Sequence, residues 1–288
     1  MKLTLYITLL ILPFQQCIGQ DLVPFRDNGL WGYKDQQQGL ISILPQYDYA
    51  STFLYDIAIV GRNDKKGAIN KQNVLLVPIE HEFLQLLDSS EFLYGRKAEY
   101  FGEYIVGVMT FDQEIKIPAE YNGIRKIKNT YLLTKNIDSI ISYTNGEVIR
   151  SVSYLQGLND LDGNVLIPCE YSNITWKNDT LIVVSRGKNQ GLFNNKGKQL
   201  TGFEYVVFGD FIEGVAKARI NNKFGFIYPT GEVAIPIQFE YCDNFRNGYA
   251  YIMQGNKWGL INKKGEIVIE TKFEFEDLQI IVEKKYGR

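Results

Sequence analysis

A carboxylate recurs immediately before an aromatic residue along most of the chain. The six positions are Glu82, Glu120, Glu170, Glu204, Glu240 and Glu274. Each lies an odd number of residues, 13 or 15, after a recurring glycine, so continued strand pairing would keep these side chains on one face. Such a row could collect cations or cationic ligands, or supply the paired carboxylates of a glycan hydrolase. The interpretation we favour is plainer: each is a solvated edge or turn residue that satisfies a backbone N–H.

Two segments hint at ion or phosphate binding. Asp160–Asn164 resembles part of a calcium loop, but Leu158 and Cys169 would occupy the first and last ligand positions, where neither can serve. Gly191–Lys198 resembles a phosphate loop, yet five residues separate its glycines and Gln199 stands where Ser or Thr is needed. The sequence therefore predicts no metal site and no cofactor.

Catalytic constellations are equally unsupported. His81 is the one histidine of the chain, which argues against histidine triads and multi-histidine metal sites. It lies in a polar bend, where we expect a solvated loop residue. Trp176 could stack on a sugar or anchor a partner from an exposed hairpin, or pack against an inserted hairpin. We predict no catalytic residue and no enzymatic activity.

Composition indicates a globular protein. The 288 residues are 45% hydrophobic, enough for a packed core, and the formal net charge is −2. The chain has no block of Lys and Arg, so nothing indicates nucleic-acid binding.

The N-terminus predicts export. Lys2 precedes an apolar run ending at Phe14, and small residues then suit cleavage after Gly19. We expect residues 1–19 to be a signal peptide and residues 20–288 to act in the periplasm, in the cell envelope or outside the cell. Lipid attachment at Cys17 is the alternative, although Gln16 is larger than the residue that normally precedes a lipidated cysteine. No later run is long and apolar enough to span a bilayer.

Two cysteines follow the predicted signal. Cys169 and Cys242 lie 73 residues apart in the sequence. An exported chain could pair them, but buried free thiols are our prediction.

The rest of the chain is a repeat array. We call the glycine near the start of each repeat core the lead glycine. In the four later copies the lead glycines are Gly157, Gly191, Gly225 and Gly259, each 34 residues after the one before. Gly32, Gly67 and Gly107 are the lead glycines of three earlier copies that match the pattern less closely. The seven repeat cores are near 31–48, 66–83, 106–121, 156–171, 190–205, 224–241 and 258–275. A longer gap after Gly107 indicates an inserted hairpin at about 131–151, with its turn at Asn145-Gly146.

Each repeat predicts a small antiparallel sheet. In the sixth copy we expect strands at 214–220, 224–228 and 232–235, with tight turns between them. Pro236 should end ladder pairing, and 239–241 could form a short fourth strand. No segment has a sustained helical period, so helix content should be very low.

The lead glycines and the aromatic side chains explain how neighbouring repeats would pack. A lead glycine inside a strand allows a neighbouring backbone or ring to approach closely. One aromatic side chain per copy should stack between neighbouring units as core. These are Tyr47, Phe83, Tyr121, Tyr171, Tyr205, Tyr241 and Phe275.

The pattern resembles the bacterial WG-repeat family. Trp31-Gly32 and Trp258-Gly259 match its dipeptide, Phe224-Gly225 is close, and the other copies have lost the aromatic residue. The resemblance implies an all-β array and a binding or scaffold role, with no catalytic residue to carry over. We expect protein or glycan partners, with self-assembly as the alternative.

Two global shapes fit seven such units: a propeller-like ring, which we favour, and an open twisted β-solenoid. Leu278 to Lys285 is similar to the first strand of an eighth copy. That strand would either complete the N-terminal unit, and so close the ring, or cap an open array.

Overall fold

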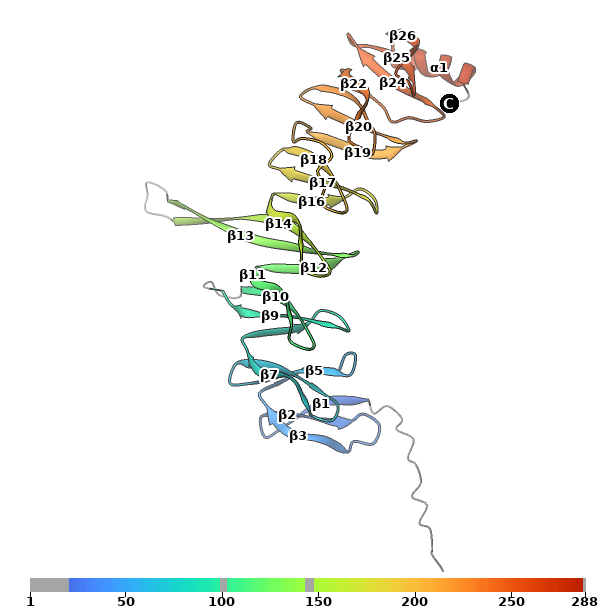
Figure 1. Ribbon diagram of the computed structural model, residues 1–288. Coiled ribbons are helices and arrows are strands. Elements are labelled where there is room, and N and C mark those ends of the chain that lie inside the picture. The colour runs from blue at the N-terminus through green and yellow to red at the C-terminus, as the bar shows by residue number, and fades with distance from the viewer. Residues whose placement is uncertain (1–20, 99–102, 143–147, 287–288) are drawn as a thin grey trace, which may run out of the picture. The chain divides into compact units, whose positions relative to one another are not determined.

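The computed structural model describes residues 21–98, 103–142 and 148–286. The predicted signal peptide, with Cys17, lies outside these residues. The chain forms two compact units, the first ending at Ala119 and the second beginning at Glu120. In the described residues the strands form seven antiparallel sheets of three or four strands (Figure 1), which confirms the all-β repeat architecture.

The first unit holds three sheets built from consecutive strands. They are β1 (Leu22–Asp27), β2 (Leu30–Asp35) and β3 (Ile41–Tyr47); β4 (Tyr49–Ala50), β5 (Ile57–Arg62), β6 (Lys65–Asn70) and β7 (Leu75–His81); and β8 (Phe83–Leu86), β9 (Glu91–Lys97), β10 (Tyr104–Thr110) and β11 (Ile115–Tyr121), whose end reaches the second unit.

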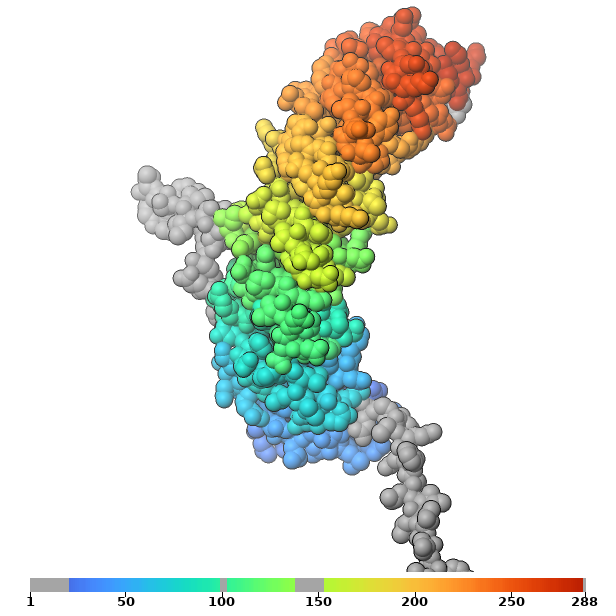
Figure 2. Space-filling view, viewed as in Figure 1, coloured from blue at the N-terminus to red at the C-terminus, as the bar shows by residue number. Residues whose placement is uncertain are grey.

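The second unit holds four sheets and a terminal helix. They are β12 (Gly123–Ile127), β13 (Thr130–Ser142), β14 (Val148–Asp160) and β15 (Val165–Tyr171); β16 (Asn173–Trp176), β17 (Leu181–Arg186) and β18 (Asn189–Asn194); β19 (Val207–Ile212), β20 (Val215–Ile220), β21 (Lys223–Ile227) and β22 (Val233–Phe239); β23 (Tyr241–Cys242), β24 (Tyr249–Gln254), β25 (Lys257–Asn262) and β26 (Ile267–Phe273); and α1 (Phe275–Tyr286). In each unit the sheets follow one another in chain order, as the colours of Figure 2 show.

Residues with positive φ form the turns. Asn63 (φ 51°) and Asp64 (φ 60°) join β5 to β6 in a two-residue turn whose twist suits a hairpin. The turn six residues after the lead glycine also needs a left-handed residue, which is Gly231 (φ 90°) in the sixth repeat. Asn73 and Gln113 take this conformation in the second and third repeats, so the turn persists where the glycine has been lost.

The edge strand bulges over the lead glycine. Phe224 pairs with Phe239 and Phe226 with Ile235, so three residues of β22, including Pro236, lie opposite Gly225 alone. A Cβ on Gly225 would be 2.5 Å from the carbonyl oxygen of Pro236. The predicted close backbone approach is confirmed. The prediction that Pro236 ends the strand is wrong: β22 continues to Phe239, because an edge strand at a bulge does not need the missing N–H.

The core lies between neighbouring sheets of each unit. Tyr33 and Ile43 of the first sheet pack against Val60 and Ile69 of the second, and the same arrangement recurs in the second unit. Each repeat alone would leave this face in water, so the sheets stabilise one another.

Strand pairing shifts the aromatic position in three repeats. In six repeats the residue just before the lead glycine pairs with a ring-bearing residue of the next strand segment. In chain order these ring-bearing residues are Tyr47, His81, Tyr171, Tyr205, Phe239 and Phe273. Phe83, Tyr241 and Phe275, the expected core rings, lie two residues further along the chain. Tyr241 is 37% exposed whereas Phe239 is 2% exposed, so the expected assignment was wrong there.

The C-terminal segment is a helix, which corrects the prediction of an eighth first strand. Helix α1 lies beside the last sheet (Figure 1). Its residues Leu278 and Val282 are fully buried and pack against Tyr251 and Leu260 of that sheet. Acidic residues in its first turn and basic residues in its last turn complement the helix dipole. The helix covers the face on which another sheet would stack. Ring closure of the array stays a prediction.

The insertion in the fourth repeat lengthens two ordinary strands. β13 and β14 have 13 residues each and pair from Thr130–Asp160 to Ser142–Val148. The other strands have at most seven residues among those described. The expected turn at Asn145-Gly146 lies outside the described residues.

Candidate functional site

A polar side chain caps a hairpin at most sheet junctions. The residue that follows an edge strand accepts a hydrogen bond from a backbone N–H of the next central hairpin. The bonds are Asn63 N to Asp48 Oδ2 (2.7 Å), Lys97 N to Glu82 Oε2 (2.8 Å), Asn136 N to Asn122 Oδ1 (2.9 Å), Gly187 N to Ser172 Oγ (3.0 Å) and Asn256 N to Glu240 Oε2 (3.2 Å). These contacts tie the residue after an edge strand to the hairpin that follows it.

The recurring glutamates do not share one kind of contact. Glu82 and Glu240 are capping residues, and in each the donated backbone N–H is the first cause that holds the carboxyl pKa below its usual value. Glu274 instead pairs with Lys257. Glu170 lies before its aromatic residue and is 3.9 Å from Arg186. The favoured interpretation, a backbone N–H acceptor, applies to two of the six.

The calcium-like and phosphate-like segments are one recurring turn. Asp160 Oδ1 accepts bonds from Asp162 N (3.0 Å) and Asn164 N (2.8 Å). Asn194 makes the equivalent bonds to Lys196 N and Lys198 N. The backbone donors of both loops are thus used within the turn. Among the residues described, no group of three His, Cys, Asp or Glu side chains is arranged to hold a metal ion.

His81 is an internal repeat residue, not the solvated loop residue that we expected. It ends β7, pairs with Lys66 and packs edge-on to Tyr94 at a centroid distance of 6.1 Å. Its Nε2 is buried without a hydrogen-bond partner. Burial, as the largest cause, lowers the pKa of His81 from its usual 6.5.

The lowered pKa predicts acid sensitivity above the range where carboxylates titrate. As the pH falls, the His81 imidazole takes up a proton in the unfolded chain at a higher pH than in the folded chain. The free energy of unfolding therefore decreases as the pH falls from about 6.5 toward the folded-state pKa. Because one proton is involved, the free energy of unfolding changes by at most about 1.4 kcal/mol per pH unit. We expect His81→Phe to remove this loss in urea unfolding between pH 7 and pH 5.5. The matched control is Tyr47→Phe at the equivalent position. Parallel pH profiles for the wild type and His81→Phe would contradict the prediction.

Trp176 and the cysteines lie within the packed structure. Trp176 is half-buried against the core around Leu132 and Leu158, and the Lys128 ammonium lies 4.9 Å from its ring centroid. The interpretation of Trp176 as an exposed anchor is therefore wrong, and Trp176 is a packing residue. The two cysteines in the described chain are free: Cys242 is fully buried, which raises its pKa to about 12, whereas Cys169 is half-buried.

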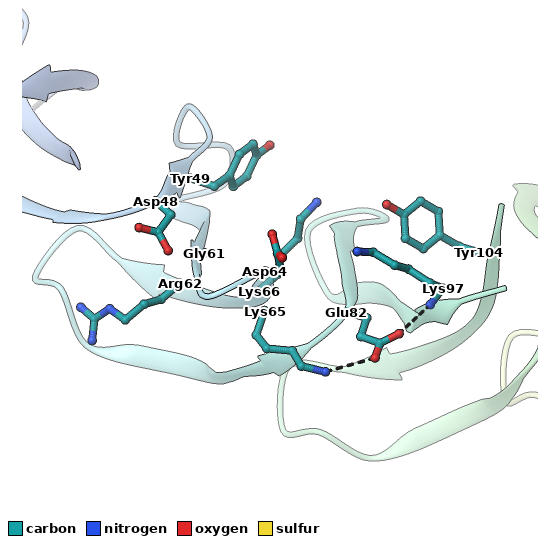
Figure 3. Close-up of a pocket in the computed structure, with 10 residues that line it drawn as sticks. All are labelled: Asp48, Tyr49, Gly61, Arg62, Asp64, Lys65, Lys66, Glu82, Lys97 and Tyr104. Atoms are coloured by element: carbon teal, nitrogen blue, oxygen red, sulfur yellow. Dashed lines mark hydrogen bonds and ion pairs between the residues drawn. The ribbon is translucent and has the colours of Figure 1, made fainter. Parts of the chain in front are cut away.

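A surface pocket of about 260 Å³ lies between the second and third sheets of the first unit (Figure 3). It is the candidate functional site. Strands β4, β5 and β6, the β5–β6 turn, Glu82 between β7 and β8, the end of β9 and the start of β10 supply its walls. The lining residues are Asp48, Tyr49, Gly61, Arg62, Asp64, Lys65, Lys66, Glu82, Lys97 and Tyr104.

Ring packing shapes two sides of the pocket. Tyr104 packs on Phe83 with centroids 4.6 Å apart, which holds the Tyr104 ring in place. Tyr49 is 46% exposed, and the Lys66 ammonium lies 4.9 Å from its ring centroid. Figure 3 shows the polar ends of Lys66, Lys97 and Tyr104 directed into the same space.

Two of the three carboxylates in the pocket have structural partners. Asp48 and Glu82 are hairpin caps, and Glu82 also pairs with Lys65 at 3.2 Å. The exposed carboxylate of Asp64 has no hydrogen bond or ion pair to another described residue. The pocket thus offers lysine ammonium donors, the unpaired Asp64 carboxylate and the phenol rings of Tyr49 and Tyr104. This set can bind hydroxyl and acidic groups.

Sequence reasoning named Glu82 but missed the pocket as a whole. Its residues occupy ordinary repeat positions, and only sheet stacking brings them together. The available signal was the run Arg62–Lys66, which holds three cations around a hairpin turn.

Comparisons with solved structures find distant likenesses. A dihydro-heme d1 dehydrogenase NirN in complex with DHE is 11% identical, with 86% of this chain and 72% of that chain covered and a TM-score of 0.29. A eukaryotic initiation factor is 6% identical, with coverages of 87% and 96% and a TM-score of 0.26. No curated protein matches the chain. Among the described residues, no helix has both the length and the apolar character needed to cross a membrane.

The repeats themselves match a known family model. The WG containing repeat matches residues 31–65, 157–188, 191–224, 224–258 and 258–275, which together make up more than half of the chain. These stretches include five of the seven lead glycines, Gly32, Gly157, Gly191, Gly225 and Gly259. The chain belongs to the WG containing repeat family.

Proposed function

We propose that the chain is a non-catalytic, exported binding module that engages a protein or glycan partner. The observation that carries the proposal is the pocket of the first unit. There an exposed tyrosine ring, Tyr49, lies beside the ammonium groups of Lys66 and Lys97. Aromatic and cationic side chains grouped in a concave site are typical of recognition surfaces. The conspicuous carboxylates of this site, Asp48 and Glu82, hold backbone N–H groups, which supports binding over acid–base chemistry.

Affinity capture from native envelope extract tests this function. The bait is the chain from Gln20 to Arg288, and the matched variant carries Tyr49→Ala and Lys66→Ala. We expect a reproducible protein or glycan partner on the wild type and its loss on the variant. Recovery of no partner, or equal recovery on both baits, would refute the proposed role of the pocket. Amino-terminal sequencing of the exported protein should begin at Gln20.

Self-assembly is a second candidate, favoured by a recurring exposed side chain. Six edge strands begin with an apolar residue that is more than half exposed: Ile41, Leu75, Ile115, Val165, Val233 and Ile267. Exposed edges with apolar side chains promote pairing between chains. Sedimentation velocity at rising concentration tests this function without ligand. Association that is abolished by lysine at Ile41, Leu75 and Ile115 would support it, and a concentration-independent monomer would exclude it.

A further inference from the structure

Two lysines of the pocket between the second and third sheets have no ion pair to another described residue. They are Lys66 and Lys97, whereas Lys65 pairs with Glu82 and the Arg62 guanidinium is directed away from them (Figure 3) and donates to the Gln46 carbonyl oxygen. Glu82 is paired with Lys65, and both Glu82 and Asp48 accept backbone N–H bonds. Their lone pairs are therefore partly used. The ammonium groups of Lys66 and Lys97 can therefore pair with an anionic group on the ligand.

Lys66 places a charge beside an aromatic surface. Its ammonium is 4.9 Å from the Tyr49 ring centroid and 5.9 Å from that of Phe83. A ligand acid group that pairs with this ammonium would lie next to the exposed Tyr49 ring. The ligand should therefore carry an acid group close to an apolar face.

Hydroxyl recognition is the second requirement. The Asp64 carboxylate lies at the turn beside Lys65 and can accept hydrogen bonds from ligand hydroxyls. The Tyr104 phenol, fixed by Phe83, can donate or accept. Sugar rings combine an apolar face with several hydroxyls, whereas an acidic peptide offers few hydroxyl donors. The volume of about 260 Å³ is just below the range of drug-sized sites, about 300–1,000 Å³, and suits one or two sugar units of a longer chain.

We infer that this pocket binds an anionic saccharide, a sugar unit bearing a carboxylate or a sulfate. Lys66 and Lys97 contact the acid group, the Tyr49 ring packs against the sugar face, and Asp64 accepts from a hydroxyl. This inference rests on the proposed binding function and adds the chemical class of its ligand.

Isothermal titration of the chain from Gln20 to Arg288 tests the inference with matched probes. Oligogalacturonate is compared with its methyl ester, which keeps the sugar rings and removes the charge. Dextran sulfate is compared with dextran, which distinguishes a sulfate from a carboxylate requirement. We expect at least one acidic probe to bind, at least tenfold more tightly than its neutral partner, and to weaken as salt increases.

Variants connect binding to the pocket. Lys66→Ala and Lys97→Ala should each weaken binding of the acidic probe about tenfold, whereas Lys66→Arg should retain most of it. Lys264→Ala removes an exposed lysine from the second unit and should leave binding unchanged. Circular dichroism melting of each variant shows whether the fold is intact.

Three results would overturn the inference: no binding of either acidic probe, equal binding of acidic and neutral probes, or equal loss with Lys264→Ala. Tighter binding of polyglutamate than of both acidic saccharides would also overturn it and would assign the pocket to acidic peptides. The proposed binding function stands in any of these cases if the extract partner is still lost with Tyr49→Ala and Lys66→Ala. Only the failure of that capture removes the binding function.

Discussion

Leu278→Ala should destabilise the last repeat by about 2–5 kcal/mol, the usual cost of truncating a fully buried leucine. Leu278 is fully buried between α1 and the last sheet, where it shares a cluster with Tyr251 and Leu260. The substitution leaves a cavity under the helix and weakens its attachment. Hydrogen exchange of the β24 and β25 amides should quicken, and the thermal unfolding transition should begin at a lower temperature.

Ile280 provides the matched control on the same helix. It is 64% exposed, so Ile280→Ala should change stability by less than about 0.5 kcal/mol. Equal destabilisation by the two variants would show that the helix does not act through its buried face.

Gly225→Ala should cost about 1–3 kcal/mol, the range for forcing extra atoms into a packed site. The new methyl carbon would be 2.5 Å from the Pro236 oxygen and 2.6 Å from the Ile235 oxygen. Both are backbone atoms of the bulge and cannot rotate away. Either the bulge opens or β21 separates from β22, and urea unfolding should register the loss.

Gly123→Ala separates this clash from the general effect of replacing a strand glycine. At Gly123 the nearest neighbour of an added Cβ is the Cβ of Thr134, at an ordinary 3.8 Å. We expect little change or a small gain in stability, because alanine restricts the unfolded chain. Equal losses at Gly225 and Gly123 would mean that the bulge does not require the lead glycine.

The repeat architecture was predictable because backbone geometry fixes certain residue types. Gly225 must lack a side chain under the bulge, and Gly231 must adopt a positive φ. Both requirements recur in successive copies, so the 34-residue period of the glycines reports the fold directly.

The position of the core ring was harder to predict. Two ring-bearing residues stand two apart in the second, sixth and seventh repeats, such as Phe239 and Tyr241. Because side chains alternate along a strand, residues two apart are expected on the same face of the sheet. Only the pairing of Phe239 with Phe224 across the bulge shows that Phe239 is the buried ring. The same ambiguity concealed His81, because a histidine at an aromatic position looks like a polar loop residue.

The helix and the pocket depended on contacts that a sequence does not display. Helix α1 has only two buried residues, Leu278 and Val282, so its apolar period is too short to stand out. Its acidic first turn and basic last turn were the usable signal. The pocket depends on the stacking of two sheets, which brings Tyr49 and Tyr104 to one cavity although they are 55 residues apart.

The pairing of strands only with their neighbours along the chain has a kinetic consequence. Every sheet in the described chain is a run of consecutive strands, with no pairing to a distant repeat. All-β domains usually fold slowly because their strands pair across long loops. Here each hairpin closes a short loop, such as the two-residue turn between β5 and β6, so the search for native contacts stays local. This protein should fold faster than a β-sandwich of similar size, with each repeat adding to the one already formed.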